Sequence, residues 1–310
     1  RQRQMCIRDR GYPVTVFEKE KELGGMLTLG IPSFRLEKDV IRAEIDILRD
    51  LGVQFKTGVA VGTDITLDAL RAEGFKAFYL AVGASRGAKL CCPGEELPGV
   101  MTSDELLEGT DTPYQSIVII GGGVIGVEFA TFYSHLGCQV TLVEGMANLL
   151  PQLDRELGQN LAQILKKQGV EVLTSAMVQS VEQTAGGLCV HLEQKGKELT
   201  VTGEKVLCAI GRRAYFDGLF AAGLTPALNG KRLLVDESYQ TSIPGVYAIG
   251  DASAAVQLAH VAAAQGTDCV ERMCGGKGSI DLNVIPSCIY SAPEIAAVGL
   301  AEAEAREQGI

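Results

Sequence analysis

Short runs of apolar and β-branched residues alternate along the chain with segments in which apolar residues recur at helical spacing. Helical spacing is clearest over residues 38–51, before Gly52, and over residues 127–136, before Gly137, since glycine commonly ends a helix. The runs that predict strands are residues 14–17, 53–55, 77–82, 117–120, 139–143, 170–173, 188–193, 205–210 and 246–249. This alternation is typical of parallel α/β architecture. We expect an α/β fold with two Rossmann-like nucleotide-binding domains, one inserted in the other.

Residues 116–133 have about the minimum length of a membrane-spanning helix, and these 18 residues are mostly apolar. This stretch contains Glu128 and four glycines, however, and it begins with the β-branched run at residues 117–120. A buried strand, a glycine turn and a helix explain this composition better than one long helix does. No transmembrane helix is expected.

The composition is that of a globular protein with an excess of glycine. The chain has 310 residues, 37 of them glycine, and 46% hydrophobic residues, enough for two domains and a piece of a third. Its formal net charge is −10 and it has no lysine or arginine run, which argues against nucleic acid and anionic membranes as partners. Nine cysteines at irregular spacing do not suit a disulfide scaffold, so we expect a reducing, cytoplasmic location.

The first ten residues do not fit the pattern that follows them. Residues 5–10 (MCIRDR) look like the translation of a transposon-end adapter used in sequencing libraries. We therefore interpret residues 1–10 as a non-native tail. The alternative is a short native tail.

Residues 121–126 (GGGVIG) fit the G-x-G-x-x-G pattern, and their surroundings make the match specific. A predicted strand precedes them, a predicted helix follows, and the next strand ends at Glu144, 18 residues after Gly126. In this arrangement the glycines let the backbone approach a pyrophosphate, and the acidic residue receives a ribose hydroxyl. The residues of this motif expected to bind NAD are Gly121, Gly123, Val124, Ile125, Gly126 and Glu144. The alternative is a glycine-rich turn that binds nothing.

Glu144 also predicts which coenzyme is bound. Its carboxylate would repel the 2′-phosphate of NADP(H), and residues 145–147 include no arginine that could bind this phosphate. We therefore expect NAD(H) in preference to NADP(H).

Further motifs follow one another along the second part of the chain. They are residues 98–104 (PGVMTSD), 121–128, 209–213 (AIGRR), 241–251 (TSIPGVYAIGD), 257–260 (QLAH) and 285–294 (IPSCIYSAPE). Through them, residues 86–310 resemble the FAD-dependent pyridine nucleotide-disulfide oxidoreductases, most closely the dihydrolipoamide dehydrogenase branch. Residues 11–85 resemble a different flavin-binding branch, that of the glutamate synthase small subunit, through residues 16–19 (VFEK), 23–27 (LGGML) and 30–36 (GIPSFRL).

The resemblance implies two cofactors, FAD and NAD, and gives roles to particular positions. Asp251 would bind the ribitol chain of FAD, and a helix that begins near Leu258 would direct its amino end at the flavin. The family also places Gly211 against the nicotinamide and Glu128, the candidate catalytic residue, close to flavin N5. The residues expected to contact FAD are Glu18 (at the adenosine ribose), Gly24, Gly25, Gly250, Asp251, Leu258, Ala259 and His260 (through its backbone N–H).

The same resemblance predicts the domain organisation. The expected parts are an FAD domain (residues 11–110 and 236–282), an NAD domain (111–235) and the start of a dimer-interface domain (283–310). The family's first glycine motif is absent, and the chain stops before the family's His–Glu acid/base pair. We therefore interpret the chain as a fragment truncated at both ends, whose parent is a homodimer. Residues 86–115, rich in proline and glycine, are expected to link the domains.

The redox cysteine pair of the family is missing from this sequence. Disulfide reductases carry Cys-x4-Cys soon after the Gly-Gly pair and then Ile-Pro-Ser-Lys, whereas residues 24–34 (GGMLTLGIPSF) contain neither cysteine nor lysine. Thiol exchange through a dithiol beside the flavin is therefore not expected here. Cys269 and Cys274 have the same spacing, but on a helix they would point about 140° apart, so we interpret them as structural thiols. His135 and His191 are expected at the surface, and no metal site is predicted.

These features predict an NADH-linked FAD oxidoreductase that transfers hydride between nicotinamide C4 and flavin N5. The electron acceptor stays open, because the dihydrolipoamide dehydrogenase-like part favours a disulfide and residues 11–85 favour another centre such as an iron–sulfur protein. A chimera of two genes would explain this mixture. A hypothesis of another class is an NAD-binding module without turnover, which the missing first glycine motif favours.

Overall fold

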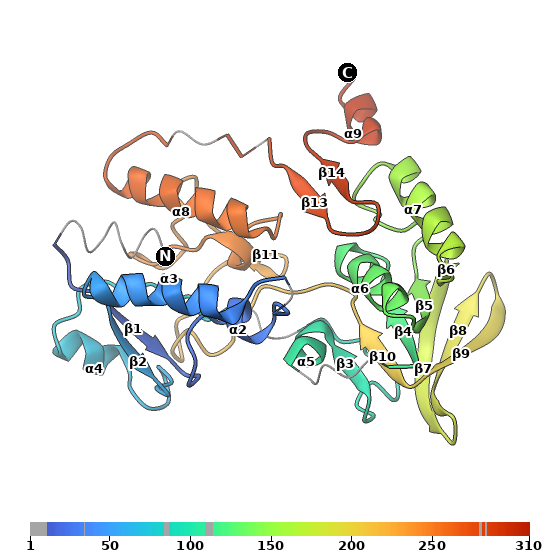
Figure 1. The fold of residues 1–310 in the computed structure, drawn as a ribbon. Helices are drawn as coiled ribbons and strands as arrows, with labels where there is room; N and C mark the ends of the chain where they lie inside the picture. Colours follow the sequence, from blue (N-terminus) through green and yellow to red (C-terminus); the bar gives the residue numbers. More distant parts are fainter. Residues whose placement is uncertain (1–10, 34, 84–86, 109–113, 279–280, 283) are drawn as a thin grey trace. The chain divides into compact units, whose positions relative to one another are not determined.

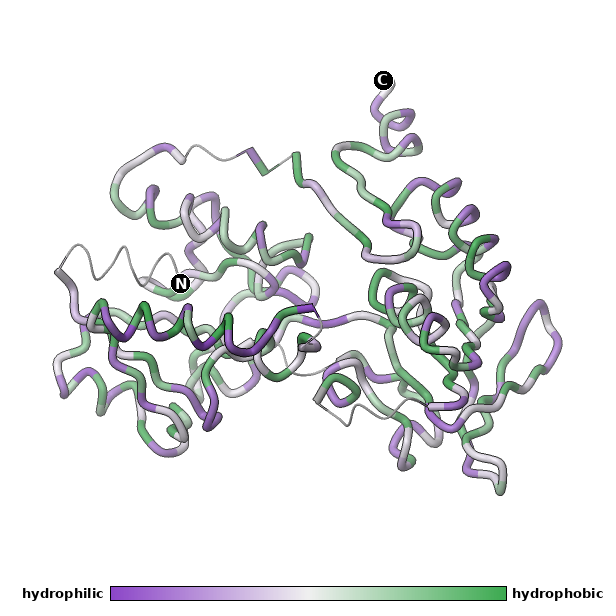
Figure 2. The backbone as a smooth tube through the Cα atoms, in the orientation of Figure 1, coloured by the Kyte–Doolittle hydropathy of each residue, from purple (hydrophilic) through white to green (hydrophobic). Residues whose placement is uncertain are grey.

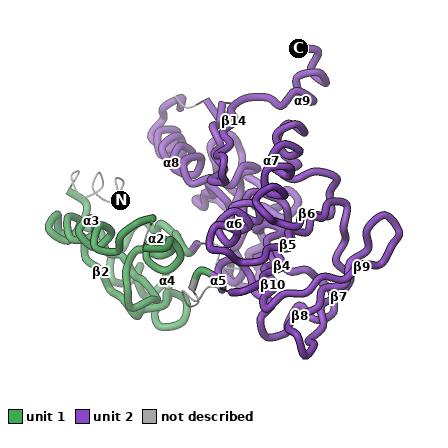
Figure 3. The backbone as a smooth tube through the Cα atoms, turned by 45° about the vertical axis from the view of Figure 1, so that its right-hand side comes forward, with its two compact units in different colours: residues 1–82, 107–110 green, residues 83–106, 111–310 purple. Residues whose placement is uncertain are grey.

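The computed structural model describes residues 11–33, 35–83, 87–108, 114–278, 281–282 and 284–310 (Figure 1). As far as they are described, residues 1–82 and 107–110 form one compact unit, unit 1, and residues 83–106 and 111–310 form unit 2 (Figure 3). The predicted tail at residues 1–10 and the predicted boundary at residues 110–111 lie outside the described residues. The predicted FAD domain has residues in both units, and the domain boundaries stay predictions.

Unit 1 contains a pair of parallel strands connected by an amphipathic helix. Its elements are β1 (Thr15–Glu18), α2 (Met26–Leu29), α3 (Lys38–Asp50), β2 (Gln54–Thr57) and α4 (Leu67–Ala72). Hydrophilic and hydrophobic positions alternate along α3 (Figure 2), and the buried residues Ile41 and Leu48 lie two turns apart on one face of this helix. This face supplies part of the core of unit 1.

Unit 2 is built on a five-stranded parallel sheet and the helices that connect its strands. In pairing order, the strands are β3 (Val100–Thr102), β10 (Lys205–Cys208), β4 (Ser116–Ile120), β5 (Gln139–Glu144) and β6 (Glu171–Thr174). The connecting helices are α6 (Val124–His135), between β4 and β5, and α7 (Arg155–Lys167), between β5 and β6. Because the strands are parallel, the residues that follow β4, β5 and β10 lie at one edge of the sheet, where nucleotides bind in such folds.

A three-stranded antiparallel sheet covers one face of the parallel sheet. Its strands are β7 (Ala176–Thr184), β8 (Gly187–Gln194) and β9 (Lys197–Gly203). The side chains of β4 alternate between two cores: Val118 and Ile120 pack in one cluster with Val190 of β8, whereas Ile117 and Ile119 pack with residues of α6 and α7. Unit 2 therefore has helices, the parallel sheet and the antiparallel sheet as three layers.

The remaining elements of the chain are short, except for one long helix. They are α5 (Ser103–Glu108), β11 (Leu228–Asn229), β12 (Arg232–Leu233), the 3-10 turn η1 (Gly250–Ala252), α8 (Ala259–Met273), β13 (Ser287–Ile289), β14 (Ile295–Ala297) and α9 (Glu302–Glu307). Helix α8 is the helix expected to begin near Leu258. Within the described residues, no helix combines the length and the apolar character that a bilayer crossing needs.

Two predictions of strands are wrong. Residues 77–82 pair with no described strand, and residues 246–249 make only an isolated bridge, from Tyr247 to Gln240. Conversely, the segment 86–115, for which no strand or helix was expected, contains β3 and α5; that it links the domains stays a prediction. An apolar run becomes a strand only where a partner strand is available, and three residues suffice where one is, as the pairing of β3 with β10 shows.

Candidate functional site

The turn between β4 and α6 places a helix amino end at the carboxyl edge of the parallel sheet. Helix α6 begins at Val124, and its N-cap residue Gly123 makes no side-chain hydrogen bond to the helix. The N–H groups of the first turn, around Val124 and Ile125, have no intrahelical acceptor, and the helix dipole is positive there. A pyrophosphate is an anion suited to this position.

The glycines of this turn are required for two different reasons. A Cβ on Gly121 would lie 2.4 Å from the carbonyl oxygen of Ala209, and one on Gly126 would lie 1.7 Å from that of Gly121. These two glycines therefore allow the turn, the helix and β10 to pack closely. A Cβ on Gly123 would meet nothing within 4 Å. The backbone at Gly123 is thus open to a ligand, and the turn fits a dinucleotide.

Glu144 ends β5, the strand next to β4, and its carboxylate lies against the glycine turn. Its Oε2 accepts a hydrogen bond from Gly122 N at 2.6 Å, and its Oε1 accepts one from Met146 N at 2.6 Å. The residue is only 9% exposed. A carboxylate has about four lone-pair sites, so capacity remains for a ribose hydroxyl. The structure thus brings Glu144 beside the turn, as its spacing in the sequence predicts.

A cavity of about 210 Å³ follows Glu144 along the chain. It is lined by Met146, Ala147, Asn148, Leu149, Leu150, Pro151, Leu153 and Arg155. Its wall is mostly apolar, and its volume is below the roughly 300–1,000 Å³ of typical ligand pockets, so we assign no ligand to it. Arg155 lies beyond residues 145–147, whose lack of an arginine supports the predicted preference for NAD(H).

Gly211 lies beyond β10, the other neighbour of β4. Its φ of +111° suits glycine, and a Cβ there would meet nothing within 4 Å. The following residue, Arg212, forms an ion pair with the buried Asp104 at 3.5 Å, and Ala88 N donates to Gly211 O at 3.0 Å. The peptide at Gly211 is therefore held from two sides while its Cα faces open space. The Asp104–Arg212 pair was missed, although both residues belong to family motifs.

Glu128 lies on α6 and is half-buried. Its Oε1 accepts a hydrogen bond from Tyr290 N, beyond β13, at 2.8 Å. This contact joins α6 to the segment predicted to begin an interface domain. A position of Glu128 near flavin N5 stays a prediction.

The FAD-binding residues predicted in unit 2 lie around η1 and the start of α8. Gly250 N donates to Gln265 Oε1 at 2.7 Å, and a Cβ on Gly250 would lie 2.7 Å from Ala262 Cβ, so η1 packs tightly on α8. The N-cap residue of α8, Leu258, makes no side-chain cap hydrogen bond, which leaves the first-turn N–H groups for a ligand. The imidazole Nε2 of His260 lies 2.8 Å from Pro286 O. This contact engages one nitrogen of the imidazole, and the role of the His260 backbone N–H at a cofactor stays a prediction.

The same helix amino end includes Ala259, and Asp251 lies within η1, half-buried. These residues suit a flavin: the helix end is uncapped and positive, and η1 contains a carboxylate and a glycine that packs closely on α8. The assignment of Asp251 to the ribitol chain stays a prediction.

The FAD-binding residues predicted in unit 1 lie at the end of β1 and in the turn that precedes α2. Glu18 Oε1 accepts a hydrogen bond from Glu20 N at 2.9 Å. Gly24 and Gly25 have φ values of +115° and +53°, which glycine adopts without strain. Glu18 thus ends its strand as Glu144 ends β5. Their participation in one FAD site with residues of unit 2 stays a prediction.

Comparison with known proteins relates the chain to one family. Residues 7–266 match the family described as pyridine nucleotide-disulphide oxidoreductase. The dihydrolipoyl dehydrogenase of Bacillus subtilis (strain 168) is 39% identical over 222 residues, which are 70% of this chain and 47% of that protein. The enzyme of the same name from Geobacillus stearothermophilus is 34% identical over 222 residues, 69% of this chain and 47% of that protein. The chain thus spans about half the length of these relatives.

Solved structures share the fold at lower identity. The HOCl-induced flavoprotein disulfide reductase RclA from Escherichia coli has a TM-score of 0.76 and 20% identity, covering 99% of this chain and 76% of that chain. LpdA from Mycobacterium tuberculosis has a TM-score of 0.75 and 22% identity, with coverage of 99% and 76%. These similarities confirm the predicted α/β class with Rossmann-type domains.

Proposed function

The chain belongs to the family of pyridine nucleotide-disulphide oxidoreductases, and on this basis we propose that it transfers hydride between NAD(H) and FAD. The main support is the carboxyl edge of the parallel sheet, where three neighbouring strands end. The open backbone at Gly123, the carboxylate of Glu144 and the side-chain-free Gly211 lie at or just beyond these strand ends. The predicted cofactors agree with the family description, which contains a pyridine nucleotide, and with the flavoprotein among the solved structures.

In this proposal the two ends of NADH are bound by different parts of the edge. The first-turn N–H groups of α6 bind the pyrophosphate, and Glu144 accepts from the adenosine ribose. Gly211 leaves room for the nicotinamide ring, because any side chain there would project into the space where a Cβ now meets nothing within 4 Å. The Asp104–Arg212 ion pair holds this peptide in place. We infer a preference for NADH over NADPH from the charge of Glu144.

A bound flavin supplies the two-electron acceptor or donor for the hydride. The chain's contribution is to bind it and to stabilise negative charge near its N1 and O2 atoms with the amino end of α8, by about 0.3–1 kcal/mol at an exposed site and more where partly buried. Leu258, Ala259 and His260 form this end. Hydride transfer needs alignment and exclusion of water, and no side-chain acid.

Two candidates exist for the electron acceptor of the parent protein. Similarity to dihydrolipoyl dehydrogenases favours a disulfide substrate for the parent protein. The absence of cysteine from residues 24–34 favours instead a parent that passes electrons to another centre, in the manner of the glutamate synthase branch. A homodimeric parent and a cytoplasmic location are further proposals.

The visible spectrum of the purified chain, with and without added FAD, separates the proposed enzyme from a non-catalytic NAD-binding module. We expect a yellow protein that binds NADH and loses its flavin absorbance when NADH is added without oxygen. A chain that binds NADH but takes up no flavin would contradict the proposal and support the module. Repeating the titration with NADPH tests coenzyme preference, since equal or faster reduction by NADPH would contradict the role given to Glu144.

A further inference from the structure

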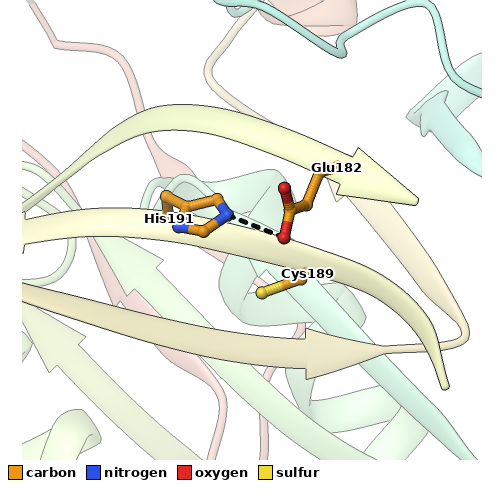
Figure 4. Close-up of side chains that lie close together, drawn as sticks. All are labelled: Glu182, Cys189 and His191. Atoms are coloured by element: carbon orange, nitrogen blue, oxygen red, sulfur yellow. Dashed lines mark ion pairs between the residues drawn. The ribbon is translucent and has the colours of Figure 1, made fainter. Parts of the chain in front are cut away.

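Three side chains that commonly bind metal ions meet on the antiparallel sheet. Glu182 lies on β7, and Cys189 and His191 lie on β8 (Figure 4). A carboxylate oxygen, a thiol sulfur and an imidazole nitrogen of these residues all lie within 4.8 Å of one another. The sequence alone predicts His191 at the surface and no metal site, because only the pairing of β7 with β8 brings Glu182 close to Cys189 and His191.

The strand register, and not one side-chain conformation, brings the three groups together. Glu182 pairs directly with Cys189 in the antiparallel ladder. His191 follows Cys189 by two residues on the same strand, so both side chains lie on one face of the sheet. The alternate residues Val190 and Leu192 are buried in the core against the parallel sheet. Their burial fixes the opposite, outer face for the cluster.

The distances within the cluster suit one tetrahedral ion. His191 Nε2 lies 3.3 Å from Glu182 Oε1. Nitrogen and oxygen ligands at about 2.0–2.2 Å from a tetrahedral Zn²⁺ lie about 3.4 Å apart. A sulfur ligand at about 2.3 Å lies about 3.6 Å from such a nitrogen. The sulfur lies within 4.8 Å of the other two atoms, so a shift of at most about 1.2 Å, to which the more exposed imidazole and carboxylate can contribute, brings the three atoms to these separations.

The cluster combines one buried ligand with two that solvent can reach. Cys189 is 8% exposed, whereas the side chains of His191 and Glu182 are 37% and 59% exposed. The thiol is therefore held in place by packing, and an ion can approach from the side of the imidazole and the carboxylate. The chain's net charge of −10 also favours the approach of a cation.

We propose that Glu182, Cys189 and His191 form a site for a divalent cation of the Zn²⁺ class, with the fourth position open to water or a small ligand. Thiolate and imidazole select Zn²⁺ over Mg²⁺ and Ca²⁺, which prefer oxygen ligands. On binding, the Zn–S bond forms as the S–H bond breaks, the thiol proton passes to solvent, and the imidazole binds in its neutral form. The thiolate and the carboxylate balance the charge of the ion, which links β7 to β8.

The test is a titration of the complete, reduced and metal-free chain with Co²⁺, followed by Zn²⁺. We expect one equivalent of Co²⁺ to produce a thiolate-to-metal charge-transfer band in the near ultraviolet, and Zn²⁺ to displace it. Cys189→Ser should abolish the band. His191→Gln and Glu182→Gln, which change partly or largely exposed side chains, should each weaken Co²⁺ binding by at least about tenfold.

Matched controls make the result specific. Glu171→Gln removes an exposed carboxylate from another strand, and His135→Gln and Cys274→Ser remove an exposed imidazole and an exposed thiol elsewhere. All three should bind Co²⁺ like the unchanged chain. No Co²⁺ binding, a band that survives Cys189→Ser, or equal binding after His191→Gln and Glu182→Gln would overturn the proposal and leave an ordinary surface ion pair. If Cys189→Ser fails to fold, the two exposed variants decide the question. NADH plays no part in the titration, so its outcome is separate from that of the proposed oxidoreductase function.

Discussion

Replacing Glu144 with glutamine tests two roles of this carboxylate: it closes the glycine turn, by accepting hydrogen bonds from Gly122 N and Met146 N, and it binds the ribose. The amide keeps the size of the side chain, but its NH₂ group cannot accept a hydrogen bond. One of the two backbone donors, Gly122 N or Met146 N, each now 2.6 Å from a carboxylate oxygen, loses its acceptor at a residue that is 9% exposed. A hydrogen bond to a charged group contributes about 1.5–3 kcal/mol, so the free energy of unfolding should fall by about that amount.

Glu144→Gln should also weaken coenzyme binding, by a free energy similar in size to the loss of stability. If a ribose hydroxyl donates to Glu144, the variant loses a charged acceptor, which corresponds to about 10- to 150-fold weaker NADH binding. NADPH should lose less, because the variant no longer repels its 2′-phosphate. The preference for NADH over NADPH should therefore shrink.

The assays are a urea titration for stability and fluorescence titrations with NADH and NADPH. Glu171→Gln is the matched control, because it removes the same charge from the opposite, amino edge of the same sheet. It should leave both dissociation constants unchanged. If Glu144→Gln lowers stability but not NADH affinity, the carboxylate only closes the turn, and the ribose assignment is refuted. If neither changes, the account of the turn is refuted as well.

The remaining predictions concern the glycine turn and the packing of α8. Gly123→Ala should fold normally but bind NADH at least about tenfold more weakly. Gly126→Ala should fail to fold stably, because its Cβ would lie 1.7 Å from a carbonyl oxygen. Circular dichroism and NADH titration distinguish the two variants, and equal behaviour of both would contradict the account. Tyr239→Phe removes the hydroxyl that donates to the buried Asp268 at 2.9 Å, so the free energy of unfolding should fall by about 1.5–3 kcal/mol in a urea titration. An unchanged urea midpoint would be inconsistent with that hydrogen bond. The guanidinium of Arg272, hydrogen-bonded to Asp268, lowers the pKa of this carboxyl below its ordinary value. A carboxyl pKa that is lowered in the folded state stabilises the protein at pH values above the ordinary carboxyl pKa, and this stabilisation is lost as pH falls below about 4. The free energy of unfolding should therefore decline below that pH, and less steeply in Asp268→Asn.

The elements that define the nucleotide site could be predicted because their signals are local. The run at residues 117–120 is β-branched and bounded by glycine, and the helix after it ends at a glycine, so strand, turn and helix each follow from a few adjacent residues. The position of Glu144 then follows from the spacing of the motif, because this residue ends the next strand, 18 residues after Gly126. In the structure its carboxylate lies against the turn.

Other features could not be predicted, because they depend on partners distant in the sequence. Strands β7 and β9 have exposed outer faces and few apolar residues in a row, so their pattern is weak. Strand β3 has three residues and exists through its pairing with β10, about a hundred residues later. Residues 77–82 show the converse, since their apolar pattern predicts a strand that pairs with no described partner. The Glu182–Cys189–His191 cluster likewise requires the register of β7 on β8.

The most direct measurement of the central claim is anaerobic reduction of the FAD-loaded chain by NADH carrying deuterium at nicotinamide C4. We predict that one equivalent of NADH removes the flavin absorbance and that deuterium at one face of C4 slows this reduction. Gly123→Ala should need a higher NADH concentration for the same rate. A flavin-loaded chain that binds NADH while its flavin stays oxidised would contradict the account.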